Sequence, residues 1–555
     1  MHAASSRLAV LALPRPVSGK NTSEQRRLFD EPSQIKQSPA FMRRMRTIFL
    51  LLVVVAVSTE INAAAPETRK ISLEESIKIA LEHNLDVQIE RINPEISRYN
   101  LSFAYAGWDP VLTASGQHDF SLSPGGLDPQ NRPFLGSETD ANTFRAGLSG
   151  LLPFGLNYNL SGNLTDSYGT RPDLTQILSP DGTTNFLSNR FPFENTVGQA
   201  GVIVLRQPLL KNFWIDSTRA NIAVNKKRLK ISELGLSQQI MNTVTSVELA
   251  YYDLVFAQEN VKVQEKALQL ADQLLRENKK RVEVGALAPL DEKQAESQAA
   301  ARRADLLSAN RLLAAQQNVL KNLLSDKYTD WQAVSLEPAE ALSAPPPLLN
   351  LQDSWQKGLS QRPDLLQARV DLERQQIVLR YDHNQLFPQL DLIGSYGHLA
   401  SGREFSDALG QIKEGSNPYY SYGAAITIPL SNRAARQTYK ISKAEQRQLL
   451  LRLKKLEQSV MVDIEDAVKL AQTNFERVDA TKQARLYAEA ALEAEQKKLE
   501  NGKSTSFNVL FLQRDLTLAR SSEIQALTEY NRALSQLSLK EGTTIERNRL
   551  KVEIR

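Results

Sequence analysis

The hydrophobic pattern is most regular between Ile240 and Val282, where every seventh residue is apolar. The column consists of Ile240, Val247, Leu254, Val261, Leu268, Leu275 and Val282. This heptad spacing, with Glu, Lys, Gln and Asn around it, is typical of a coiled helix. Because neither Gly nor Pro interrupts residues 236–284, we expect a helix of roughly 67 residues that begins near Ser217 and is on the order of 100 Å long. An apolar stripe this narrow is buried only when other helices pack beside it.

The chain also contains an internal repeat. Residues 72–81 match residues 350–359 at an offset of 278, and a second match at an offset of 217 aligns Gly285 with Gly502. We therefore predict a tandem organisation in four parts after the N-terminus: a first structural repeat (66–336), a linker (337–350), a second repeat (351–541) and a C-terminal tail (542–555).

Both repeats follow one predicted order of elements. A helix of moderate length comes first, at 72–106 and 351–386, and ends before a proline, Pro110 or Pro388. Two strands follow, then a long helix that ends at Gly285 or Gly502, and then a return helix. The strands are expected at 112–122 and 197–206, and at 390–396 and 421–428; the return helices are expected at 290–324 and 507–539.

The predicted strands have one apolar and one polar side. In residues 112–122 the apolar side consists of Leu112, Ala114, Gly116, His118, Phe120 and Leu122. Four such strands of about ten residues suit a bilayer, but four strands cannot close a barrel, and open edges are forbidden in lipid. The subunit must therefore oligomerise. Residues 148–164 are either a further hairpin, which raises the count from four strands to six, or a surface excursion.

The N-terminus reads as a targeting segment. Arg43, Arg44 and Arg46 precede an apolar run at 48–57, and three alanines at 63–65 offer a cleavage site. The run is too short to span a bilayer. We interpret residues 1–65 as a misplaced start followed by a secretory signal that begins at Met42 or Met45; the alternative is an N-terminal anchor helix.

Composition excludes several classes of function. The chain has no cysteine, so a disulfide, a thiolate metal site and a lipoprotein anchor are excluded. Residues 1–65 contain nine basic and four acidic residues, so the net charge of +4 comes from the N-terminus and no nucleic-acid partner is expected. The five histidines have no metal-ligand spacing, and no GxxxxGK or GxSxG motif occurs. We expect no enzyme, no catalytic residue, no cofactor and no metal.

Four segments resemble the TolC-like outer-membrane efflux protein family: LEESIKIALEHN (73–84), QPLLK (207–211), RVEVGALAPLDEKQAE (281–296) and KLENGKSTSFNVLFLQ (498–513). The resemblance implies a mainly α-helical homotrimer in the outer membrane, with a twelve-stranded membrane β-barrel and a periplasmic α-barrel. It also implies a passive exit duct of a tripartite efflux or type I secretion system, with a periplasmic adaptor and an inner-membrane RND or ABC transporter as partners.

The resemblance also implies where functional residues lie. The family's adaptor-docking turns correspond to Val284, Gly285, Ala286 and Leu287 and to Asn501, Gly502, Lys503 and Ser504. These glycines are equally consistent with an ordinary helix cap. At the periplasmic gate, where the family has inward-pointing aspartates, this chain has Asn508 and Phe511, with Asp291 as the first-half equivalent. We therefore expect weak cation block.

Two other classes of protein share part of this pattern. A periplasmic coiled-coil adaptor would have one helical hairpin flanked by compact β-domains, and a diffusion porin would have many more strands and no long helices. The pattern of two hairpins, each preceded by paired strands, favours the exit duct. The transported cargo cannot be read from the sequence.

Overall fold

The chain divides into two units, residues 1–65 and residues 66–555. The computed structural model describes residues 67–129, 131–178, 180, 182, 184–285, 287–346 and 349–550. The predicted misplaced start and signal peptide therefore lie outside the described residues. The following description concerns the second unit.

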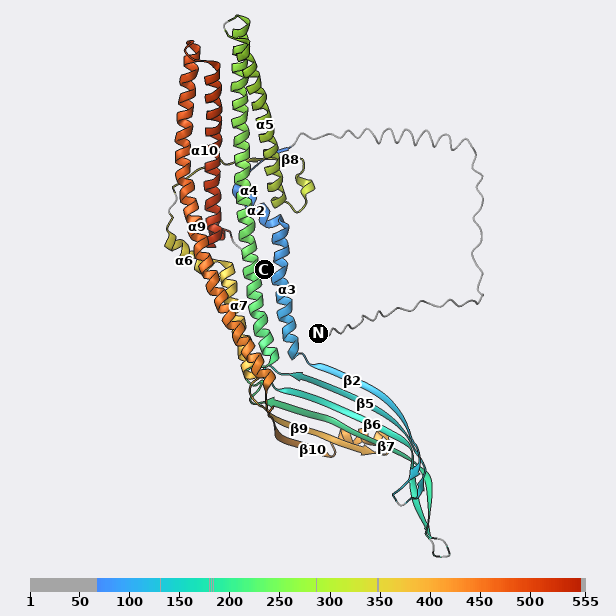
Figure 1. Ribbon diagram of the computed structural model, residues 1–555. Helices are drawn as coiled ribbons and strands as arrows, with labels where there is room; N and C mark the ends of the chain where they lie inside the picture. Colours follow the sequence, from blue (N-terminus) through green and yellow to red (C-terminus); the bar gives the residue numbers. More distant parts are fainter. Residues whose placement is uncertain are drawn as a thin grey trace, which may run out of the picture. The chain divides into compact units, whose positions relative to one another are not determined.

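Each predicted opening helix is in fact two helices (Figure 1). The first half begins with α2 (Leu73–His83) and α3 (Leu85–Tyr105), followed by the short η1 (Ala106–Trp108). The break lies at Asn84, whose side chain accepts hydrogen bonds from the backbone N–H groups of Asp86 and Val87 and so caps α3. In the second half α6 (Leu351–Gln361) is followed by α7 (Pro363–Asn384), because Pro363 cannot continue α6 but fits the first position of α7.

The long helices match the prediction from the heptad pattern. Helix α4 (Ser217–Glu283) has 67 residues and α9 (Arg433–Glu500) has 68, and they are followed by α5 (Pro289–Leu324) and α10 (Ser506–Glu541). The first four residues of the heptad column, from Ile240 to Val261, are buried. Beyond them the buried positions shift to Ala267, Ala271, Leu274 and Asn278, since a helix of 3.6 residues per turn drifts relative to a seven-residue repeat.

The helices form side-by-side rows (Figure 1). In the half of α4 near the sheet, α4 lies between α3 and α7, and α7 packs against α9. Toward the helical turns, α4 packs against both α5 and α10, and α10 packs against α9. Each row is four helices wide, and the outer side of the helix at each end has no neighbouring helix among the described residues.

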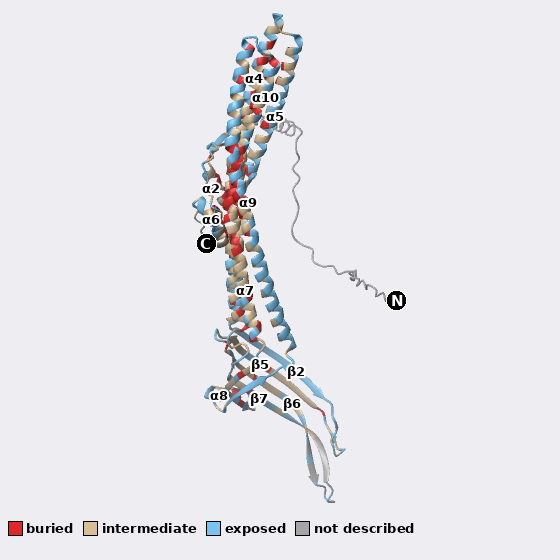
Figure 2. Ribbon diagram, turned by 60° about the vertical axis from the view of Figure 1, so that its left-hand side comes forward, coloured by how far each residue is buried: buried red, intermediate tan, exposed pale blue. Residues whose placement is uncertain are grey.

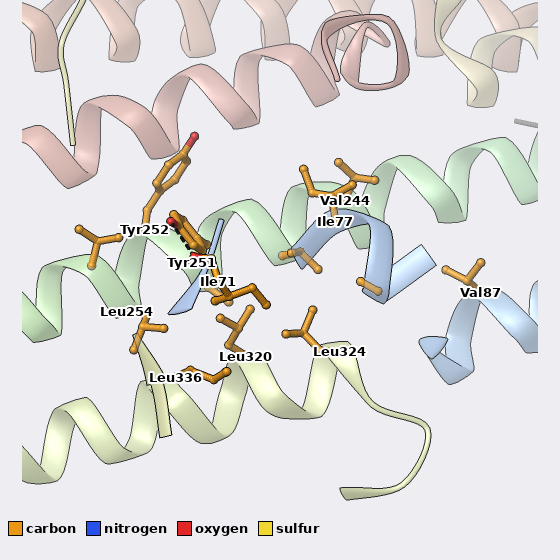
Figure 3. Close-up of a cluster of buried hydrophobic side chains, with 14 of the residues drawn as sticks. Ile71, Ile77, Val87, Val244, Tyr251, Tyr252, Leu254, Leu320, Leu324 and Leu336 are labelled. Carbon is orange, nitrogen blue, oxygen red and sulfur yellow. Dashed lines mark hydrogen bonds between the residues drawn. The ribbon is translucent and has the colours of Figure 1, made fainter. Parts of the chain in front are cut away.

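The main hydrophobic core lies where α2, α4 and α5 meet β1 (Glu67–Ile71) and β8 (Val334–Pro338), which pair in parallel. Figure 3 shows Ile71, Leu254, Leu320 and Leu336 packed together, with the Tyr251 hydroxyl donating to the Ile71 carbonyl at 3.3 Å. Buried residues concentrate along the helices, while the sheet is largely exposed (Figure 2). Part of the predicted C-terminal tail, residues 543–550, packs against this core, because Ile545 and Leu550 contact it beside α11 (Thr544–Arg547).

The sheet has six strands, not four. The order is β10 (Pro418–Thr427), β9 (Gln389–Gly402), β7 (Thr184–Pro208), β6 (Asn157–Leu178), β5 (Ser137–Leu151) and β2 (Val111–Ser123), and all neighbours are antiparallel. Residues 148–164 form the ends of β5 and β6 and the turn between them, so they are a hairpin within the sheet. A further pair, β3 (Gly126–Leu127) and β4 (Pro133–Phe134), lies in the connection between β2 and β5.

The sheet has an apolar and a polar face. Cross-strand partners lie on one side of a sheet, so the register assigns each position to a face. The apolar face includes Leu112, Phe144, Leu148, Leu160, Leu164, Ile203, Leu205, Leu392, Tyr396, Tyr422 and Ile426. The opposite face is mainly polar, with Thr113, Ser115, Thr143, Asn159, Ser161, Asn163, Ser395 and Ser421, and its apolar exceptions on β7 and β9 are Val197, Val202, Val204, Ile393 and Leu399. Most of the large apolar side chains on the first face are exposed in the single chain.

Helix α8 (Phe405–Glu414), between β9 and β10, packs on the apolar face. Its Ala408 is buried with Leu164 and Ala400, and Ile412 packs against them. A shallow cavity of about 620 Å³ lies between Leu409, Ile412 and the apolar face of β2, β5 and β6. Among the described helices, none combines the length and the apolar character needed to cross a membrane.

Candidate functional site: the helical turns

The first helical turn joins α4 to α5 at Gly285. Val284 and Gly285 close the helix, with their N–H groups donating to the carbonyls of Lys280 (3.2 Å) and Val282 (3.0 Å). Gly285 has φ +75, a left-handed conformation that glycine adopts readily but that costs L-residues energy. Val284 is 79% exposed, and Leu287 is half-buried. The fourth predicted turn residue, Ala286, lies outside the described residues.

The second turn, between α9 and α10, has the same geometry. Gly502 has φ +69, and the N–H of Lys503 donates to the Lys498 carbonyl at 2.8 Å, which completes a Schellman closure. The Asn501 side chain also donates to the Lys497 carbonyl at 2.8 Å. Both turns lie at the ends of the helical pairs farthest from the six-stranded sheet (Figure 1). Seven of the eight predicted docking positions thus lie at these two turns, and the eighth, Ala286, is outside the described residues.

A polar network stiffens the second turn. The carboxylate of Glu495 accepts hydrogen bonds from the Ser504 hydroxyl (2.5 Å) and from the Lys498 ammonium (3.0 Å). These bonds, the serine's first, hold the pKa of Glu495 below its ordinary value, so this carboxylate is ionised at neutral pH. Exposed groups of this kind contribute little stability individually, but they fix the geometry of the turn.

The predicted gate residues do not all point into free space. The Asn508 side chain is exposed, and it donates to Glu495 and to the Ser504 hydroxyl, each at 3.5 Å, so it faces its own turn. Phe511 is 46% exposed, and the Arg514 guanidinium lies 4.5 Å from its ring centroid. The open face of α10 is therefore aromatic and cationic at this level.

The third predicted gate residue, Asp291, leads to a contact that sequence reasoning missed. The side chain of Asn278 on α4 donates to the Asp291 carbonyl on α5 at 3.5 Å and accepts from the Ser506 hydroxyl on α10 at 3.0 Å. Asn278 is 1% exposed, so one buried amide connects the two hairpins next to both turns. In the sequence Asn278 continues the spacing of Ala267, Ala271 and Leu274, but only the structure shows that this column is buried.

An apolar cluster reinforces this connection. Leu274 on α4 packs with Leu492 and Leu499 on α9 and with Val509 and Leu516 on α10. A polar cavity of about 200 Å³ lies beside it, and its lining includes Glu277, Arg281 and Gln513. The two turns are thus held together by one hydrogen-bonded amide and a small apolar cluster. So few buried contacts allow the two hairpins to separate at low free-energy cost. Among the described residues, no group of His, Cys, Asp or Glu is arranged to hold a metal ion.

The comparisons with known proteins agree with this architecture. The family model described as outer membrane efflux protein matches residues 181–325 and 355–542, which is more than half of the chain. The chain belongs to the outer membrane efflux protein family. This efflux protein therefore lies in the outer membrane, as the resemblance predicted.

Relatives of this efflux protein are distant in sequence. The pyoverdine export outer membrane protein OpmQ of Pseudomonas aeruginosa is 25% identical over 319 residues, 57% of this chain, and the match spans 64% of OpmQ's length, less than two thirds. The outer membrane protein TolC of Vibrio cholerae is 24% identical over 398 residues, 68% of this chain and 83% of TolC. The solved structure of the outer membrane protein VceC from Vibrio cholerae shares the fold, with a TM-score of 0.59 and 17% identity, over 85% of this chain and 96% of VceC.

Replacing either turn glycine of this efflux protein should loosen its turn. Gly502→Ala or Gly285→Ala forces a methyl-bearing residue into the left-handed region, at a cost of about 1–2 kcal/mol. We expect hydrogen exchange of the turn amides, including that of Lys503, to accelerate about 5–30-fold. The matched control is Gly410→Ala, where φ is ordinary and a methyl meets no atom within 4 Å. Equal protection in Gly502→Ala and wild type would contradict the requirement for glycine at this turn.

Removing the amide of Asn278 should uncouple the hairpins. Asn278→Leu leaves the Ser506 hydroxyl and the Asp291 carbonyl without this partner in a buried position, which costs about 1–3 kcal/mol. We expect faster hydrogen exchange in the first turns of both α5 and α10. Asn310→Leu, at an exposed position of α5, should leave exchange there unchanged. An Asn278→Leu variant that loosens only α4 would argue against a link between the two hairpins.

Proposed function

We propose that three copies of this efflux protein assemble into a passive outer-membrane exit channel that opens when its partners bind. The observation that supports the proposal best is that the six-stranded sheet and the helical rows both end on edges that have no partner among the described residues. Efflux as such is the function of the family to which the chain belongs. The assembly, the partners and the mode of opening are our proposal.

The sheet edges support assembly. All 13 residues of β2 are exposed, and so are all but one of the ten residues of β10. Their outward backbone groups have no partner strand within the described part of the chain. In lipid, each unsatisfied backbone group costs several kcal/mol, so a sheet with two open edges is not stable there. Pairing of β2 with β10 of the next copy closes the sheet into a barrel.

The helices supply a second interface. On α3, the face turned away from α4 has an exposed apolar stripe with helical spacing: Ile89 (62%), Ile92 (52%), Ile96 (49%), Tyr99 (63%) and Phe103 (80%). Stripes of this size on a soluble surface mark an interaction site. At the other end of the row, α9 has exposed apolar residues, among them Ile441, Leu451 and Val462. Packing of α3 against α9 of the next copy would bury both and produce a ring of helices.

The apolar face of the sheet has a suitable height for the membrane. Along β9 it runs from Leu390 to Ala400, which at about 3.3 Å per residue and a tilt of about 40° spans about 25 Å. This is the height of the outward-facing apolar band of outer-membrane proteins. The polar face would then line a water-filled lumen, continuous with the ring of helices.

Three copies and two partner proteins come from the family resemblance. The turns at Gly285 and Gly502 would bind a periplasmic adaptor, and an RND or ABC transporter in the inner membrane would supply the energy. OpmQ is named for pyoverdine export; for the present chain the cargo stays open. A periplasmic adaptor, the second candidate from the sequence, does not account for a six-stranded sheet with an exposed apolar face.

The assembly can be tested by disrupting the α3 stripe. Ile92→Glu combined with Ile96→Glu places charges in the proposed interface, and we expect the detergent-purified protein to lose its SDS-resistant trimer and its conductance in planar bilayers. Arg98→Glu changes charge at an exposed position on the opposite side of α3 and should retain both. A wild-type protein that is a stable monomer in detergent would refute the proposal.

The gate assignment has its own test. Asn508→Asp would place a second carboxylate beside Glu495 in each copy, and a ring of such pairs should attract divalent cations. We expect block of conductance by divalent cations to strengthen roughly tenfold, a gain of about 1.4 kcal/mol in binding. Asn310→Asp, away from the turns, is the control. Unchanged block in Asn508→Asp would mean that this position does not line the gate.

A further inference from the structure

The inserted hairpin of β5 and β6 changes the width of the sheet. Strand β2 pairs with β5 along its whole length, from Val111 opposite Ser149 to Ser123 opposite Ser137. Strand β6 then pairs with β5 on one side and with β7 on the other. The first and last strands of the first half, β2 and β7, are consequently separated by two intervening strands, β5 and β6.

The hairpin has the same two faces as the rest of the sheet. Phe144 and Leu148 on β5 lie beside Leu160 and Leu164 on β6 on the apolar face. On the other face, the hairpin is mainly polar, with Thr143, Arg145, Asn159, Ser161, Asn163 and Thr165; Leu151, at the end of β5, is an apolar exception. A surface excursion has no need for such a pattern. The pattern therefore suits a pair of barrel strands with one face toward lipid and the other toward water.

Strand direction allows all six strands to take part in closure. Neighbours alternate in direction from β10 to β2, so the two edge strands run opposite to each other and can pair antiparallel between copies. Given the trimer of the proposed function, on which this inference rests, we propose that the closed sheet has eighteen strands. The twelve strands that the family resemblance implies would require the hairpin to leave the sheet.

Eighteen strands make a wide lumen. With strands about 4.8 Å apart and tilted by about 40°, the circumference is about 113 Å and the backbone diameter about 36 Å, against about 24 Å for twelve strands. Side chains occupy about 5 Å on each wall, which leaves about 26 Å free. Twelve helices packed 8–10 Å apart have a circumference of roughly 96–120 Å, so the helical ring can continue into this sheet without narrowing.

The helix inserted in the sheet does not fill this lumen. Helix α8 packs on the apolar face, where Ala408 and Ile412 contact Leu164 and Ala400. The polar lining is mostly hydroxyl and amide groups, and its charged members include the ion-paired Arg206 and Asp391. The outer part of the channel thus suits bulky, water-soluble cargo of either charge, and selection by size falls to the helical turns.

Cysteine pairs can count the strands in the full-length protein. Because the native chain has no cysteine, each introduced pair provides its only thiols. Ala114→Cys with Ala146→Cys joins β2 to β5 at positions directly opposite each other. Ala114→Cys with Ala200→Cys, Ile203→Cys or Leu205→Cys would join β2 to β7, which the six-stranded sheet separates by about 14 Å. Ala114→Cys with Tyr422→Cys, Ala424→Cys or Ile426→Cys would join β2 to β10 of the next copy.

The three sets have separate outcomes with a short bifunctional thiol reagent in outer membranes. We expect the β2–β5 pair to give an internally linked monomer of increased mobility, the β2–β7 pairs to give no linkage, and at least one β2–β10 pair to give covalent dimers and trimers. Linkage of β2 to β7 without linkage of β2 to β5 would overturn the eighteen-stranded sheet but leave the trimer intact. Absence of any β2–β10 linkage, with β2–β5 linked, would instead overturn the proposed assembly.

Discussion

The backbone groups along the free edges of β2 and β10 impose the constraint on which the rest of the structure depends. Water can satisfy these groups in solution, but nothing in hydrocarbon can do so except another strand. In the proposed channel the apolar face of this sheet lies in lipid, so its edges would pair with strands from copies of the same chain. The same holds for the helical rows, because no described residue of the subunit covers the stripe on α3 or the outer face of α9. Symmetric assembly resolves both at once.

Elements governed by local periodicity could be predicted closely from the sequence, and elements governed by single side chains could not. The extent of α4 follows from an apolar column without Gly or Pro, and the structure agrees. The break at Asn84 depends on one capping amide, which the periodic pattern conceals. The number of strands stayed open because the sequence of residues 148–164 fits a surface excursion as well as a hairpin, and only the pairing of β5 with β6 and of β6 with β7 shows that these residues lie within the sheet.

The candidate site divides in the same way. The turns at Gly285 and Gly502 could be located because a glycine directly after a long helical pattern is a strong local signal of a left-handed helix cap, and both glycines have positive φ. Asn278 could not, since an asparagine on a charged helix reads as a surface residue until its neighbours on α5 and α10 are known. The orientation of Asn508 toward Glu495 is also a tertiary fact. A motif can therefore locate the turns, but not the contacts that hold the turns together.

The distribution of packing indicates which part of the channel is able to move. Around Tyr251 and Leu254, three helices and two strands share a large buried core, so opening there would expose much apolar surface. Near the turns, one amide and a five-residue apolar cluster join the hairpins. Regions with few buried contacts open at lower free-energy cost. In the proposed assembly, a partner that binds the turns would therefore need only a small differential affinity to spread the hairpins, and the core and the sheet would keep their structure.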